Sequence, residues 1–151
     1  MQIWVDADAC PGVVKDILFR AADRAGIKLT LVANSRLRTP ASRWIHTLQV
    51  EKGSDVADKR IVELMGPGDL VVTADIPLAA AVVEKGGTGL DPRGEVYSEE
   101  NIGQILAFRN LMHDLREEGM VGGGPPPLSK NARLEFANAL DRWLARARAD
   151  D

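Results

Sequence analysis

The chain has almost no cysteine: Cys10 is the only one among 151 residues. A disulfide framework is therefore excluded. A single domain of this length can bury roughly two thirds of the surface that its unfolded chain exposes, so it needs no such staple. Histidine is equally scarce, and His46 and His113 stand alone in the sequence. They form no spacing typical of a zinc site, and Cys10 itself is best interpreted as a small packed thiol.

Long hydrophobic runs are also missing. No apolar segment approaches the roughly 20 residues that cross a membrane, and the chain does not open with a basic segment followed by an apolar stretch. We therefore expect a cytoplasmic protein without a membrane partner. The formal net charge is −3, so binding to nucleic acid requires a local basic patch.

Short apolar runs alternate with helical patterns over the first two thirds of the chain. Strands are predicted over residues 2–6, 28–33, 44–50 and 70–74, with a short edge strand over 88–90, and helices over 13–25, 54–65 and 77–85. This order predicts an α/β fold with a mainly parallel sheet and helices on both faces.

Two long C-terminal helices are predicted over residues 98–118 and 129–150, separated by a glycine- and proline-rich linker at 120–127. We expect a single domain over 1–151, with the sheet core at about 1–95 and the helical part at about 98–150. The last helix carries an apolar stripe that packs against the sheet or against a neighbouring subunit, which leaves a homodimer open. The stripe consists of Phe136, Leu140, Trp143, Leu144 and Ala147.

Acidic residues follow the apolar strands where these end. Asp6 and Asp8 come directly after one strand, and Asp75 comes after another. In parallel sheets the carboxyl ends of the strands form the edge where ligands bind. Asp55 and Asp58 open the helix between them and share one of its faces, since they are three residues apart. Carboxylates are the ligands that Mg²⁺ and Mn²⁺ prefer, so the sequence predicts a metal site at this edge.

The same acids have structural alternatives. Asp8 and Asp55 fit helix N-caps, Asp58 fits a solvated position, and Asp75 fits the cap of the next helix. Taken singly, capping is the better interpretation of Asp8 and Asp55. Asp6 and Asp75 together favour the site, because both follow buried strands.

Asp6 and Asp8 after an apolar strand also resemble the first motif of haloacid dehalogenase-type phosphatases, in which the first aspartate is a nucleophile. Lys85 and the Asp69/Asp75 pair match the remaining motifs of those enzymes poorly. A phosphomonoesterase with Asp6 as nucleophile therefore stays open, as does a non-catalytic module that binds nucleotides or RNA.

A basic loop follows the second predicted strand. Arg36, Arg38 and Arg43 lie close together after Asn34, and Arg93 lies in a later turn. Arginines near a metal site suit phosphate groups, although an ordinary solvated loop explains them equally well.

Several stretches together resemble the YaiI/YqxD family of bacterial proteins. They cover residues 4–11, 32–34, 55–58, 68–79, 92–95 and 123–126. That family is grouped with the PIN-like, NYN-type nuclease domains, which implies a PIN-like, Rossmann-like three-layer domain and a carboxylate cluster that binds Mg²⁺ or Mn²⁺ for RNA cleavage. One departure lies in the last helix, where relatives tend to have an acidic–basic pair and this chain has Asn131-Ala132-Arg133.

The resemblance implies a metal-dependent phosphodiesterase, namely a ribonuclease with Mg²⁺ or Mn²⁺ as cofactor and RNA or another phosphate-containing substrate as partner. Carried over by motif, the catalytic residues are Asp6, Asp8, Asp55, Asp58 and Asp75, and the metal ligands among them are Asp6, Asp58 and Asp75. The expected substrate-binding residues are Asn34, Arg36, Arg38, Thr73 and Arg93.

Overall fold

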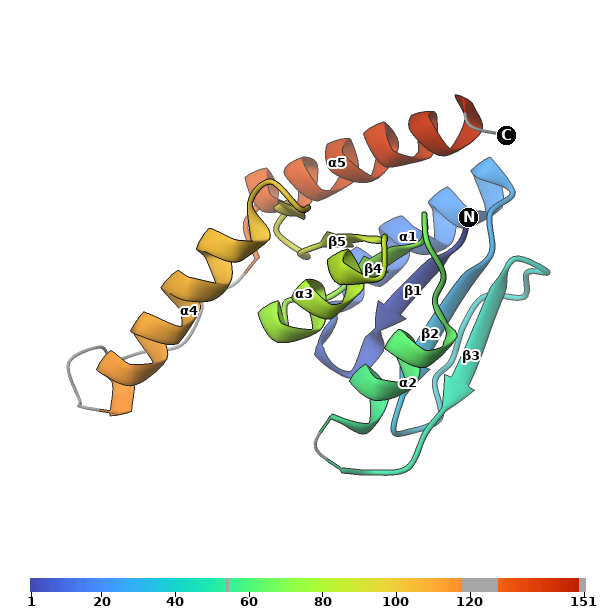
Figure 1. The fold of residues 1–151 in the computed structure, drawn as a ribbon. Coiled ribbons are helices and arrows are strands. Elements are labelled where there is room, and N and C mark those ends of the chain that lie inside the picture. Colours follow the sequence, from blue (N-terminus) through green and yellow to red (C-terminus); the bar gives the residue numbers. More distant parts are fainter. Residues whose placement is uncertain (54, 118–127, 150–151) are drawn as a thin grey trace.

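A computed structural model describes residues 1–53, 55–117 and 128–149 of the chain. Its centre is a six-stranded sheet in the order β3-β2-β1-β4-β5-β6 (Figure 1). The strands are β1 (Ile3–Asp6), β2 (Leu29–Ala33), β3 (Ile45–Gln49), β4 (Leu70–Val72), β5 (Thr88–Leu90) and β6 (Val96–Tyr97). All pairings are parallel except the one between β5 and β6. The predicted α/β fold with a mainly parallel sheet is confirmed.

Helices cover both faces of the sheet. They are a short 3₁₀ turn η1 (Ala7–Ala9), α1 (Gly12–Ala25), α2 (Val56–Leu64), α3 (Ile76–Glu84), α4 (Ile102–Glu117) and α5 (Lys130–Ala149). Ile3 and Val5 pack in one core with α1 and α5, whereas Trp4 packs with α2 and α3 in a second core. Neighbouring residues of a strand point to opposite faces, so this alternation produces the three layers.

The end of α1 and the apolar stripe of α5 follow the sequence predictions. Gly26 closes α1 in the left-handed conformation, at a φ of 63° that glycine adopts without strain. The stripe of α5 packs into the core that it shares with the sheet and α1. Of its members, Phe136, Leu140, Leu144 and Ala147 are buried, and Trp143 is half-buried.

The prediction of β5 as an edge strand was wrong. Gly89 and Leu90 pair with Tyr97 and Val96 of β6, which covers that edge. A two-residue strand is too short to show a periodicity, so the sequence gives no signal for it. Tyr97 is nevertheless buried, in a third core between α3 and the start of α4.

The helix predicted from residue 98 begins later, at Ile102. The N–H of Ser98 donates to Asn101 Oδ1, and Asn101 Nδ2 donates to the carbonyl of Val96, so these residues form a turn ahead of the helix. From there α4 extends away from the sheet (Figure 1), with Phe108 63% and Leu111 55% exposed. The predicted linker at 120–127 lies outside the described residues.

The turn between β5 and β6 is held against α5. Gly94 has a φ of 96° there, and a Cβ atom added to it would lie 2.6 Å from the backbone carbon of Glu135. Only glycine fits both this backbone conformation and this close approach. Of the helices in the described ranges, none is long and apolar enough to cross a membrane.

Candidate functional site

Asp6 and Thr73 lie side by side at the carboxyl end of the sheet. Strands β1 and β4 are parallel and pair Val5 with Val72, so the next residue of each chain segment reaches the same edge. Thr73 Oγ1 donates to Asp6 Oδ2 at 3.2 Å and accepts the backbone N–H of Asp75 at 3.0 Å. Thr73 is only 2% exposed. Its hydroxyl therefore links the two acids, which favours a positioning role over the predicted contact with phosphate.

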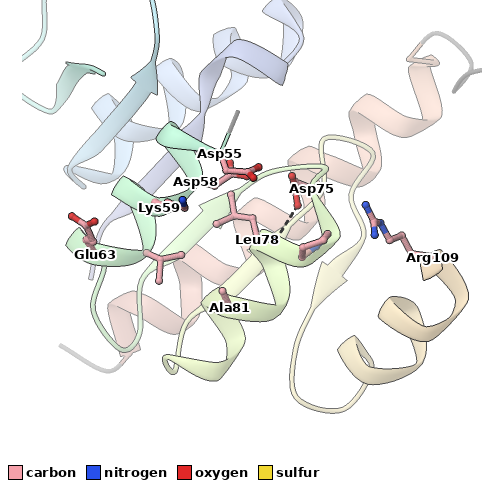
Figure 2. Close-up of a pocket in the computed structure, with 10 residues that line it drawn as sticks. Asp55, Asp58, Lys59, Glu63, Asp75, Leu78, Ala81 and Arg109 are labelled. Carbon is pink, nitrogen blue, oxygen red and sulfur yellow. Dashed lines mark hydrogen bonds between the residues drawn. The ribbon is translucent and has the colours of Figure 1, made fainter. Parts of the chain in front are cut away.

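Asp75 is the N-cap of α3, as one of the two interpretations of this residue predicted. Its Oδ1 accepts the N–H of Leu78 at 2.9 Å. This bond fixes the carboxylate at the start of the helix. Figure 2 shows the Asp75 carboxylate next to those of Asp55 and Asp58, so capping and membership of the acidic group occur together in one residue.

Asp55 and Asp58 approach from α2. Asp55 stands at the cap position with a φ of 64°, but its side chain makes no capping hydrogen bond. Asp58 is half-buried one turn later. The pKa of Asp58 is raised to about 7. Burial is the main cause, and the carboxylates of Asp75 and Asp6, a hydrogen bond with Asp75 and the charge of Asp55 contribute the rest.

The pKa of Asp6 is raised as well. Burial is the main cause, the hydrogen bond from Thr73 opposes it, and the nearby charges of Asp75 and Asp8 add to it. Asp75 is among the causes of both shifts, so the three predicted metal ligands lie near one another, from β1, α2 and the start of α3.

Asp8 is exposed and caps no helix, because Pro11 holds the cap position of α1. Its Oδ2 instead accepts the backbone N–H of Asn34 at 2.8 Å. Asp8 thereby fastens the loop that leaves β2 at the same edge of the sheet. Arg36 and Arg38 are exposed farther along this loop.

Arg93 lies half-buried in the turn between β5 and β6. The backbone N–H of Arg93 donates to Asp91 Oδ1 at 2.6 Å, and the hydroxyl of Tyr97 donates to Asp91 Oδ2 at 3.3 Å. Leu90 pairs with Val72 in the parallel register, so this turn begins at the edge where Thr73 lies. Arg93, one of the predicted substrate-binding residues, thus lies on a turn that starts at the edge shared with the acids.

A cleft of about 640 Å³ opens beside the acids, and sequence analysis did not find it. Asp55, Asp58 and Asp75 form part of its lining. The remaining lining residues are Lys59, Val62, Glu63, Pro77, Leu78, Ala81 and Arg109. They belong to α2, α3 and α4 (Figure 2). The helical pattern of α4 does not show which neighbour it contacts, so no sequence signal could place Arg109 here.

Other chemically notable residues have structural roles. Asp69 is 4% exposed and accepts hydrogen bonds from Trp4 Nε1 and from the N–H of Gly66, ahead of β4 and away from the acidic group. Cys10 is buried, as expected for a small packed thiol, and burial raises the pKa of its thiol to about 12.

The acidic group suits a hydrated hard cation. Among the described residues, no three histidine, cysteine or acidic side chains lie close enough together to hold an ion between them, and no described salt bridge neutralises these acids. The pKa of Asp58 is raised first by burial and then by the negative charge of the neighbouring acids. Mg²⁺ keeps several of its waters and is commonly held through one or two carboxylates, so the oxygen donors fit such an ion.

Comparison with known proteins gives a consistent family match. The family model described as "Uncharacterized BCR, YaiI/YqxD family" matches residues 4–146. A UPF0178 protein of Janthinobacterium sp. (strain Marseille) is 60% identical over 149 residues, which cover 99% of both chains. UPF0178 proteins of Yersinia pestis (strain Pestoides F) and Yersinia pseudotuberculosis serotype O:1b (strain IP 31758) are each 56% identical over 148 residues, covering 98% of this chain and 97% of theirs. No solved structure gave a significant match.

Proposed function

The chain belongs to the YaiI/YqxD family, and we propose that it is a metal-dependent phosphodiesterase that cleaves RNA. The observation that carries this proposal is the meeting of Asp6, Asp58 and Asp75 at the carboxyl edge of a parallel sheet. Three separate elements deliver these acids to the same edge, and the charge of Asp75 is among the causes of the raised pKa of both Asp6 and Asp58. The resemblance of the motifs to PIN-like nuclease domains points to the same chemistry.

A bound Mg²⁺ or Mn²⁺ would neutralise phosphate charge and lower the pKa of a water molecule. The protein supplies the positions of the acids. Thr73 holds Asp6 through its hydroxyl, and the capping bond to the N–H of Leu78 holds Asp75. Groups fixed in this way need little reorganisation when a substrate arrives.

Arginines around the same edge would bind the phosphate backbone. Arg36 and Arg38 lie on the loop that Asp8 fastens through Asn34, and Arg93 lies on the turn after β5. Phosphate contacts of this kind position a nucleic acid without reading its sequence. The basic loop and the acidic group together support RNA as the substrate.

The deciding experiment measures Mn²⁺-dependent cleavage of a mixed RNA pool by the wild type and by Asp6→Asn. Asp16→Asn serves as the matched control, because Asp16 is exposed on α1, on the other face of the sheet. We expect cleavage by the wild type and the control, and a loss on the order of 100-fold or more for Asp6→Asn, since even residues that support metal ligands cost 10–100-fold.

Equal cleavage by Asp6→Asn and the wild type would overturn the proposal. Hydrolysis of a phosphate monoester, together with a phosphoryl group trapped on Asp6, would replace it with the phosphomonoesterase. RNA binding without any cleavage in either metal would replace it with the non-catalytic module.

A further inference from the structure

We propose that the cleft between α2, α3 and α4 binds an unpaired nucleobase of the RNA strand whose phosphate lies at the acidic group. This inference rests on the proposed function and deepens it, because it names the form of RNA that the site accepts. It requires that the cleft adjoin the acids, that its walls suit a flat apolar ring, and that it tolerate an anionic ligand.

The cleft is continuous with the acidic group. Asp58 and Asp75 line one end of it, and Leu78 and Ala81 follow along α3 from the helix start that Asp75 caps (Figure 2). A phosphate placed at the carboxylates, with their cation, would therefore have the group attached to it next to the apolar wall. Inorganic phosphate or a small phosphate monoester has no such group, so it would leave the apolar wall exposed to water.

The walls of the cleft are apolar and already in place. Val62 faces it from α2, and Leu78 and Ala81 face it from α3. Lys85 Nζ at the end of α3 donates to the carbonyl oxygens of Val62 and Glu63, which ties the two helices together. Because the walls need not form on binding, a ring that enters the cleft gains its contacts at little ordering cost.

The charges around the cleft admit an anionic ligand that carries an apolar body. Glu63 is paired with Arg60 at 3.2 Å, on the rim away from the other acids. Lys59 and Arg109 also line the cleft as cations. A planar guanidinium both stacks on bases and contacts phosphate, and Arg109 is exposed on α4 where either contact is open to it.

The cleft is large enough to hold a nucleobase. Its volume of about 640 Å³ falls within the range of roughly 300–1,000 Å³ found for small-ligand sites. In a duplex each base is stacked and paired, and it must leave the helix before it can enter such a site. The cleft therefore favours single-stranded RNA over duplex.

The first test uses adenosine, an uncharged nucleoside, and the metal-free protein, so that neither phosphate nor cation contributes. We expect adenosine to shift the methyl NMR signals of Val62, Leu78 and Ala81, and ribose to leave them unchanged. Absence of these shifts would overturn the inference. This measurement does not depend on catalysis, so it separates failure of the cleft from failure of the proposed function.

The second test fills the cleft with Ala81→Leu and measures the affinity for a single-stranded ribo-decamer in Ca²⁺, with its duplex for comparison. Base stacking on a protein is worth about 1–3 kcal/mol per base, so the single strand should bind about tenfold more weakly or worse. Ala145→Leu is the control, because Ala145 is exposed on α5 across the sheet. Arg109→Ala is a second variant at an exposed position and should also weaken binding, with a shallower dependence on salt.

The outcomes separate the two ideas. Unchanged affinity in Ala81→Leu and Arg109→Ala, or equal binding of duplex and single strand, would overturn the base site even where RNA is cleaved. Adenosine shifts and weakened strand binding without any RNA cleavage would uphold the base site and overturn the nuclease. Binding of adenosine but not of the decamer would indicate a free nucleotide as the ligand. It would overturn the proposal that the cleft binds a base of an RNA strand.

Discussion

Thr73 Oγ1 donates a hydrogen bond to Asp6 Oδ2 across two neighbouring strands at 3.2 Å. The same oxygen accepts the N–H of Asp75 at 3.0 Å. A hydroxyl from a nearly fully buried residue thus sets the relative position of two acids that are far apart in the sequence. Four predictions follow from this arrangement and from the groups around it.

Replacing Thr73 with valine keeps the shape of the side chain and removes the hydroxyl. The N–H of Asp75 then loses its partner, which should lower the free energy of unfolding by about 1–3 kcal/mol. Affinity for Mn²⁺ should fall by about 10–100-fold, as it does when residues that support metal ligands are changed. Denaturant unfolding and Mn²⁺ titration measure the two effects.

Thr30→Val is the matched control for Thr73→Val. Thr30 is 5% exposed, and its Oγ1 has no hydrogen-bond partner among the described residues. Its replacement should therefore leave the stability unchanged or raise it slightly. If Thr73→Val and Thr30→Val change the free energy of unfolding and the Mn²⁺ affinity equally little, the Thr73 hydroxyl does not position Asp6 and Asp75.

Asp58→Asn should stabilise the metal-free protein in a pH-dependent way. The pKa of Asp58 is raised from 3.8 to about 7 in the folded state, so ionising it costs the folded state more than the unfolded chain. Stability of the wild type should fall as the pH rises from about 4 to about 7. The variant lacks this loss, so its Tm should exceed that of the wild type above pH 7 and match it near pH 4. If the difference in Tm between Asp58→Asn and the wild type is the same near pH 4 and above pH 7, the pKa of Asp58 is not raised in the folded state.

Asp6→Asn should separate metal binding from folding. Removing one charge from a crowded acidic group lowers repulsion, so the metal-free variant should melt no earlier than the wild type. Mn²⁺ should raise the Tm of the wild type by binding the folded state and should not raise that of the variant. A clear loss of stability without metal would instead make Asp6 a structural residue.

The double variant Arg36→Ala/Arg38→Ala should weaken RNA binding without reducing cleavage at saturating RNA. Each lost phosphate contact on a single strand lowers the slope of log affinity against log salt by about 0.7, so the slope should decrease by up to about 1.4. Arg20→Ala/Arg142→Ala removes the same charge from exposed positions on α1 and α5 and should leave the slope unchanged. A slope that stays the same in both variants would place the RNA elsewhere.

The sequence predicted the elements whose residues carry the signal locally. An apolar run that ends on Asp6 and another that leads to Asp75 were sufficient to predict two strands and a shared edge. Gly26 was sufficient to predict the end of α1. Each of these follows from residues within a few positions of one another.

The remaining features depend on distant parts of the chain. Thr73 is buried because β1 and β4 lie side by side, and its partner Asp6 is 67 residues away in the sequence. The cleft exists because α4 returns to α3 and brings Arg109 to it. The polar residues of α4 fit a solvated surface helix as well as a helix that lines a cleft. The sequence therefore could not show that Arg109 lies beside α3.

The close approach of Gly94 to Glu135 has a consequence for the order of events during synthesis. The acids at residues 6–75 emerge from the ribosome early, whereas the turn that carries Arg93 receives its packing partner only when α5 has been translated. A nascent chain therefore contains its acidic residues before the turn that carries Arg93 can pack against α5. The Arg93 turn is therefore packed only after α5 has been translated, later than the elements that carry the acids.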